Sequence, residues 1–142
     1  MSVPVNERTH GKLEAYTKAY ELCTYTLKIT KNKKIFTEEY QETLTDKINE
    51  TALEIFMLCG SANEEPVRSA GDFQHFQNRV QFQQMAWVRC GDLKRLILLA
   101  KPIFHLASKR VVYWTTLTAD TRNLIKGWMD ADIKRFTPLF ER

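Results

Sequence analysis

Basic side chains in the second half of the chain have the types and the spacing to bind phosphate. Lys94 and Lys101 are seven residues apart and therefore share one face of a helix. Clustered lysine and arginine side chains bind a nucleic-acid backbone because they release its condensed counterions. The competing interpretation of such a charge run is a solvated helix face. The candidate nucleic-acid-binding residues are Lys94, Arg95, Lys101, Lys109, Arg110 and Lys126.

The net charge of +4 conceals a strong segregation of charge along the chain. Residues 1–37 hold seven basic and three acidic side chains, and residues 66–135 hold twelve basic and five acidic ones. Residues 38–65, in contrast, hold eight acidic side chains and only Lys47 as a base. One acidic segment between two basic ones favours the phosphate-binding interpretation, because it leaves a positive face free.

The sequence contains none of the motifs that commonly mark catalytic or cofactor-binding sites. No phosphate-binding glycine loop, zinc-protease helix or serine-hydrolase elbow is present. The three histidines are scattered, and Cys23, Cys59 and Cys90 form no Cys-x-x-Cys pair. We therefore expect no catalytic residue, no metal and no cofactor, and we expect reduced thiols in a cytoplasmic protein.

Helices must position the basic side chains, and the first two are predicted in the N-terminal half. Apolar residues at helical spacing predict a first helix over about residues 13–30. The same pattern predicts a second helix over residues 38–59. Thr37 is expected to cap the start of this second helix, and Gly60 is expected to end it.

Two further helices are predicted in the C-terminal half. The third covers residues 72–107, with a break near Gly91 or a separate short helix at 72–82, and with Pro102 kinking or ending it. The fourth covers residues 108–136. A β-prone run lies near the start of this last segment, but a lone strand would have no partner, so helix is expected there.

Four amphipathic helices with short connections pack best as an antiparallel up-and-down four-helix bundle. A chain of 142 residues has the size of one domain, so we expect residues 1–142 to form a single all-α domain. Its apolar runs are too short to span a membrane. The residues expected in the core are Tyr20, Leu27, Ile48, Ile55, Trp87, Leu96, Leu124 and Trp128.

Four segments of the predicted helices carry a resemblance to known proteins, namely Tyr16–Leu22, Leu53–Asn63, Leu93–Ala100 and Ile125–Trp128. In these segments the chain resembles a family of small four-helix-bundle proteins. The family includes the accessory variability determinant of diversity-generating retroelements and the proteins encoded in 23S ribosomal RNA intervening sequences. Its basic residues match this sequence at Lys94, Arg95 and, more weakly, Lys126. The sequence departs from the family pattern in its longer stretch 61–84 and at Lys101-Pro102.

The resemblance implies a function without catalysis. Family members of the accessory type are basic homopentamers that bind RNA or DNA together with a reverse transcriptase, and they assist complementary DNA synthesis during mutagenic retrohoming. We therefore expect a nucleic-acid-binding accessory protein that forms a homo-oligomer, with a pentamer as the expected form. The alternative is a non-enzymatic protein-interaction scaffold of the intervening-sequence type, for which RNA binding is incidental.

Overall fold

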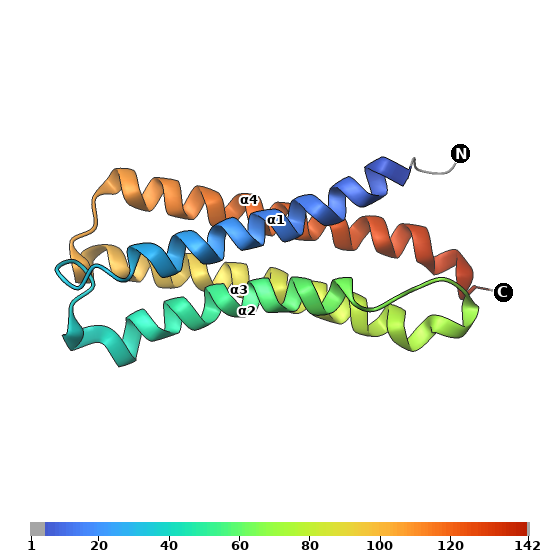
Figure 1. Ribbon diagram of the computed structural model, residues 1–142, viewed down its shortest axis with the longest axis horizontal. Coiled ribbons are helices and arrows are strands. Elements are labelled where there is room, and N and C mark those ends of the chain that lie inside the picture. The colour runs from blue at the N-terminus through green and yellow to red at the C-terminus, as the bar shows by residue number, and fades with distance from the viewer. Residues whose placement is uncertain (1–4, 142) are drawn as a thin grey trace.

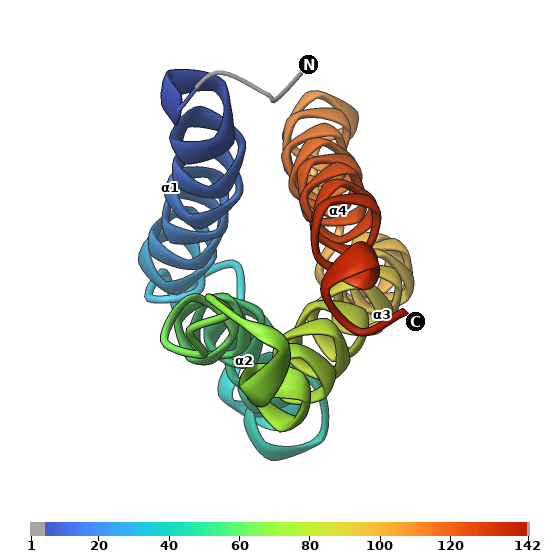
Figure 2. The same ribbon diagram turned by 90° about the vertical axis from the view of Figure 1, so that its right-hand side faces the viewer.

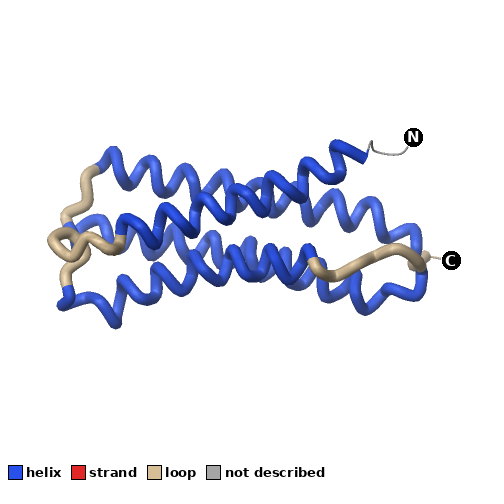
Figure 3. The backbone as a smooth tube through the Cα atoms, in the orientation of Figure 1, coloured by secondary structure: helices blue, strands red, loops and turns tan. Residues whose placement is uncertain are grey.

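The computed structural model describes the backbone of residues 5–141 and the side chains of residues 14–141. Within this part lie four long helices and no strand (Figure 3). The helices are α1 (Val5–Ile29), α2 (Asp46–Asn63), α3 (Phe73–Phe104) and α4 (Ser108–Phe136). Short helical turns at Glu38–Tyr40, Gln41–Thr45, Ala70–Asp72 and Thr137–Leu139 complete the described elements.

The four helices form an antiparallel up-and-down bundle (Figure 1). α1 packs against α2 and α4, and α3 packs against the same two helices. The view along the bundle shows α1 and α3 diagonally opposite each other (Figure 2). The α1–α2 and α3–α4 connections lie at one end of the molecule, whereas the α2–α3 connection lies at the other (Figure 1). The predicted all-α four-helix bundle is confirmed.

The core consists of one buried stripe from each helix, and most of it lies where the sequence pattern predicted. Ile48, Ile55 and Trp128 are buried as predicted. Trp87, Leu96 and Leu124 are partly buried and pack against the core. On α1 the prediction was wrong, and the exposed residues are Tyr20 and Leu27.

The error on α1 has a steric cause. The stripe of α1 that faces the core contains Ala15, Ala19 and Leu22, all fully buried. Small alanine side chains let the helix backbone approach its neighbours closely, which a tyrosine at the same place would prevent. Tyr20 instead lies at the edge of the α1–α2 interface, where its ring packs on Phe56 with the ring centroids 5.9 Å apart.

α3 is continuous, so neither the expected break near Gly91 nor the separate helix at 72–82 occurs. Gly91 is buried under the guanidinium of Arg122, which covers the helix at the point where a break was expected. Pro102 lies inside the last turn, and the helix ends two residues later at Phe104. His105 adopts a left-handed conformation there with φ 55°, which lets the Leu106 N–H donate to the Lys101 carbonyl.

The boundaries of α2 also differ from the prediction. Residues 38–45 form a 3₁₀ turn followed by a π-helical turn, and the regular α-helix begins only at Asp46. Thr37 precedes these turns in an extended conformation, but its side chain makes no capping hydrogen bond. Gly60 does not end the helix, which continues to Asn63. The acidic segment is therefore divided between irregular turns and a shorter helix.

A buried ion pair joins the helices at the end of the bundle that contains the α2–α3 connection. Nε of Arg79 donates to Oδ2 of Asp132 at 2.6 Å, and Nε2 of Gln83 donates to the same oxygen at 2.7 Å. The Arg79 guanidinium also donates to the carbonyl oxygens of Ala62 and Glu65. One arginine thus connects α3 to α4, to the end of α2 and to the following connection. Sequence spacing gave no sign of this ion pair.

We predict that Ile55→Ala lowers the free energy of unfolding by about 2–5 kcal/mol, because it leaves a cavity at a fully buried position. Leu53→Ala on the same helix is the matched control, since Leu53 is 47% exposed and should contribute well under about 1 kcal/mol. Urea denaturation of the wild type and of both variants measures the loss in free energy of unfolding. Equal losses of stability would contradict the assigned helix phase.

Candidate nucleic-acid interface

The structure brings five of the six candidate residues to one half of the molecule. Lys101 lies in the last turn of α3, and Lys109 and Arg110 lie in the first turn of α4. These three flank the α3–α4 connection (Figure 1). Lys94 and Arg95 lie one and a half to two turns earlier on α3, about 10 Å before Lys101 along the helix axis.

Lys126 is separate from the other five. It lies sixteen residues after Arg110 on α4, which corresponds to about 24 Å along the helix. Its ammonium group forms an ion pair with Asp130 at 2.8 Å. Because of this distance and this pairing, the structure does not group Lys126 with the other candidates.

The up-and-down topology adds four lysines that sequence reasoning had not assigned to the site. The α1–α2 connection lies at the same end of the bundle as the α3–α4 connection (Figure 1). Lysines at the end of α1 and in this connection therefore lie on the same end as Lys101. We call the combined set the basic end, and it consists of Lys28, Lys31, Lys33, Lys34, Lys101, Lys109 and Arg110.

An aromatic cluster holds the two connections of the basic end together. Phe36, from the first connection, is fully buried. Its ring packs on Phe104 with a centroid separation of 4.9 Å and on Trp114 at 6.2 Å. Tyr40 also packs on Phe104, with the ring centroids 5.9 Å apart. The two basic connections are thus fixed relative to one another.

The cations of the basic end are exposed or half-buried, and none of them forms an ion pair within the described residues. Lys33 donates hydrogen bonds to the side chain of Gln41 and to the carbonyl oxygen of Thr30, both of which are neutral. Residues 28–45 and 101–110 together contain these seven cations and only three carboxylates. Arg95, in contrast, forms an ion pair with Asp92. The basic end therefore retains a positive charge that an external anion can neutralise.

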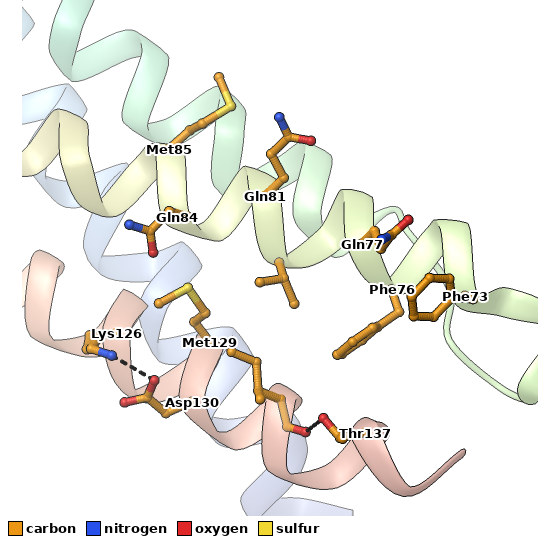
Figure 4. Close-up of a pocket in the computed structure, with 12 residues that line it drawn as sticks. Phe73, Phe76, Gln77, Gln81, Gln84, Met85, Lys126, Met129, Asp130 and Thr137 are labelled. Carbon is orange, nitrogen blue, oxygen red and sulfur yellow. Dashed lines mark hydrogen bonds and ion pairs between the residues drawn. The ribbon is translucent and has the colours of Figure 1, made fainter. Parts of the chain in front are cut away.

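A groove between α3 and α4 lies toward the opposite end of the bundle (Figure 4). Its volume is about 930 Å³. Apolar side chains from both helices form half of its lining, and the other half consists of three glutamines of α3, the Lys126–Asp130 pair and Thr137. The apolar lining residues are Phe73, Phe76, Val80, Met85, Met129 and Ile133.

The described cysteines lie inside the bundle, away from the basic end and the groove. Cys23, Cys59 and Cys90 are free and buried, as the sequence predicted. Burial raises the pKa of the Cys59 thiol to about 12 and raises the pKa of Cys90 as well. In the described part of the chain, no three histidine, cysteine or acidic side chains gather closely enough to hold a metal ion. None of the described helices combines the length and the apolar character needed to span a membrane.

Comparison of the chain with protein-family models, with curated proteins and with solved structures finds no match. We infer a function from the basic end and the groove.

We predict that Cys59 lowers stability at alkaline pH. The thiol of the unfolded chain ionises near pH 9.0, whereas burial keeps the folded thiol neutral up to about pH 12. The unfolded state therefore loses its proton first, and stability falls as pH rises above about 9. Urea denaturation between about pH 8 and pH 10 should show a steeper decline for the wild type than for Cys59→Ala. If the stability of the wild type and of Cys59→Ala declined equally with pH, the raised pKa of Cys59 would be contradicted.

Proposed function

We propose that this protein binds nucleic acid through its basic end and catalyses no reaction. The observation that favours this function is the convergence of the two basic connections at one end of the bundle, where seven cations form no ion pair with other described residues. Nucleic-acid backbones bind such clusters of cations favourably, because each neutralised phosphate releases counterions. The aromatic packing between Phe36 and Phe104 supports the proposal, since it fixes the spacing between the two halves of the cluster.

The chemistry of the basic end favours binding that is largely independent of sequence. Six of its seven cations are lysines, whose ammonium groups act as mobile point charges on flexible stems. Such groups follow a phosphate backbone but do not by themselves read base edges. The proposal is therefore a protein that holds a strand by its charge.

The resemblance supplies the wider setting of the proposal. It implies a cytoplasmic accessory protein that acts as a homopentamer beside a reverse transcriptase during retroelement complementary DNA synthesis. A reverse-transcriptase gene with a near-repeat beside the gene for this chain would support that setting. In such an oligomer the basic end would recur once in each copy, and the avidity for a long strand would increase.

We predict that replacing Lys101, Lys109 and Arg110 together with glutamine weakens binding about equally for unrelated RNA and DNA sequences. The slope of log affinity against log salt should fall by about one for each phosphate that the variant no longer neutralises. The fold should persist, because exposed charges contribute little to stability. Fluorescence anisotropy with labelled strands at several salt concentrations measures both quantities.

Lys126→Gln is the matched control for this experiment. Lys126 is already paired with Asp130 and lies far along α4, so its replacement should change the affinity and the salt slope much less. An unchanged affinity in the triple variant would show that these cations are only a solvated face. An equally large effect in the control would contradict the location of the site.

The groove favours a second candidate function, a protein-interaction scaffold. Its apolar floor lies between two antiparallel helices, which is the shape that accepts the apolar face of a third helix. Met85 and Met129 give that floor flexible side chains that adapt to a partner. The occupant that we assign to it is an amphipathic helix of a partner protein, and the resemblance makes a reverse transcriptase the partner to test first.

We predict that Ile133→Glu lowers the affinity for a reverse transcriptase encoded beside the gene by about tenfold or more, because it places a charge in the apolar groove. Leu99→Glu is the control, since Leu99 is 55% exposed and lies outside the groove. Titration calorimetry measures both variants. Equal effects of the two changes, or a steep salt dependence of the complex, would exclude the groove as the binding surface.

A further inference from the structure

A pair of tyrosines lies on the surface where α1 meets α4, beside the basic end. Tyr25 on α1 and Tyr113 on α4 pack with their ring centroids 4.9 Å apart and their planes inclined by 60°. Tyr25 is half-buried in this packing, whereas Tyr113 is 57% exposed. One ring therefore supports the other, and the outer ring faces solvent.

Buried hydrogen bonding fixes the position of this pair. Each tyrosine precedes a residue that points inward, namely Thr26 on α1 and Trp114 on α4. Nε1 of Trp114 donates to Oγ1 of Thr26 at 2.9 Å, and both side chains are fully buried. This bond sets the register of α1 against α4, and the register brings the two preceding tyrosines side by side. The exposed ring is thus held in place by the core.

Three cations of the basic end share this surface with the tyrosines. Lys109 and Arg110 precede Tyr113 by four and three residues, so they lie on the same face of α4. Lys28 follows Tyr25 by three residues on α1. Burial raises the pKa of the Tyr25 phenol, and the charge of Arg110 opposes that rise.

No other exposed aromatic residue in the described part of the chain combines these features. Tyr20 is also exposed, but the charged side chains nearest to it in sequence, Lys18 and Glu21, form an ion pair with each other. Phe73 is exposed at the opposite end of the bundle, where it packs on Phe140. The surface around Tyr113 is therefore the place where an exposed ring meets cations without ion-pair partners.

We propose that Tyr113, supported by Tyr25, stacks on an unpaired base of single-stranded nucleic acid whose phosphates contact Lys28, Lys109 and Arg110. This inference rests on the proposed nucleic-acid function and narrows its substrate class. Proteins that bind single strands combine a positive surface with aromatic side chains on which bases stack. A base in a duplex is paired and stacked on its neighbours, so it cannot reach the ring without unstacking. The protein should prefer single strands to duplexes.

The test compares three labelled probes by fluorescence anisotropy. They are an oligothymidylate of about 16 nucleotides, an abasic sugar-phosphate strand with the same number of phosphates, and a duplex of equal length. The wild type should bind the oligothymidylate most tightly. Tyr113→Leu should lower the affinity for the oligothymidylate by about tenfold, because one base loses its stacking partner, and should leave the affinity for the abasic strand unchanged.

Two further variants separate stacking from charge and from general damage. Tyr20→Leu makes the same chemical change at an exposed tyrosine outside the basic end, and it should alter none of the three affinities. Arg110→Gln should weaken the binding of all three probes and lower the salt slope by about one. Circular dichroism and urea denaturation of each variant establish whether the fold is intact.

The possible results distinguish the inference from the function on which it rests. If Tyr113→Leu binds the oligothymidylate as tightly as the wild type, or if it weakens the oligothymidylate and the abasic strand equally, the stacking inference is wrong and phosphate binding remains. If the wild type binds none of the three probes at low salt, both the proposed function and the inference are wrong. A weakening confined to probes that contain unpaired bases confirms the inference.

Discussion

The hydrogen bond between Trp114 and Thr26, together with the packing of Trp114 on Phe36, determines how the two connections at one end of the bundle meet. Tryptophan has a large apolar ring and a single donor, so burying it stabilises the fold more when that donor finds a partner. Thr26 supplies the partner within α1, and its hydroxyl is enclosed by the core. Phe36, from the α1–α2 connection, packs its ring on the ring of Trp114. The positions of the basic end and of the Tyr25–Tyr113 pair depend on this packing.

The fold was predictable from the sequence because helical periodicity and connection length specify an up-and-down bundle almost completely. The predictions of core residues and of helix ends were wrong where tertiary packing outweighs the local preference of the sequence. Alanine rather than tyrosine faces the core on α1, since close helix approach requires small side chains. Gly60 and Gly91 both remain helical, and at Gly91 the Arg122 guanidinium packs over the helix. Glycine weakens a helix by only about 1 kcal/mol, which such packing offsets.

The candidate site was predictable only in part, for a topological reason. Lys101, Lys109 and Arg110 are close in sequence, so spacing alone groups them. Lys31, Lys33 and Lys34 are about seventy residues away, and only the antiparallel arrangement brings them to the same end. The Arg79–Asp132 ion pair is a second example, since its partners are 53 residues apart. Sequence periodicity identifies the buried face of a helix but not its partner on another helix.

The groove and the basic end lie toward opposite ends of a long, narrow molecule. α3, with 32 residues, runs from one to the other and is about 48 Å long. A strand held at the basic end and a protein helix held in the groove would not compete for space, because their footprints do not overlap. The bundle would then act as a rigid spacer that keeps a strand and a protein partner at a set separation. In that arrangement the length of α3, rather than any single side chain, would determine how far the partner stands from the strand.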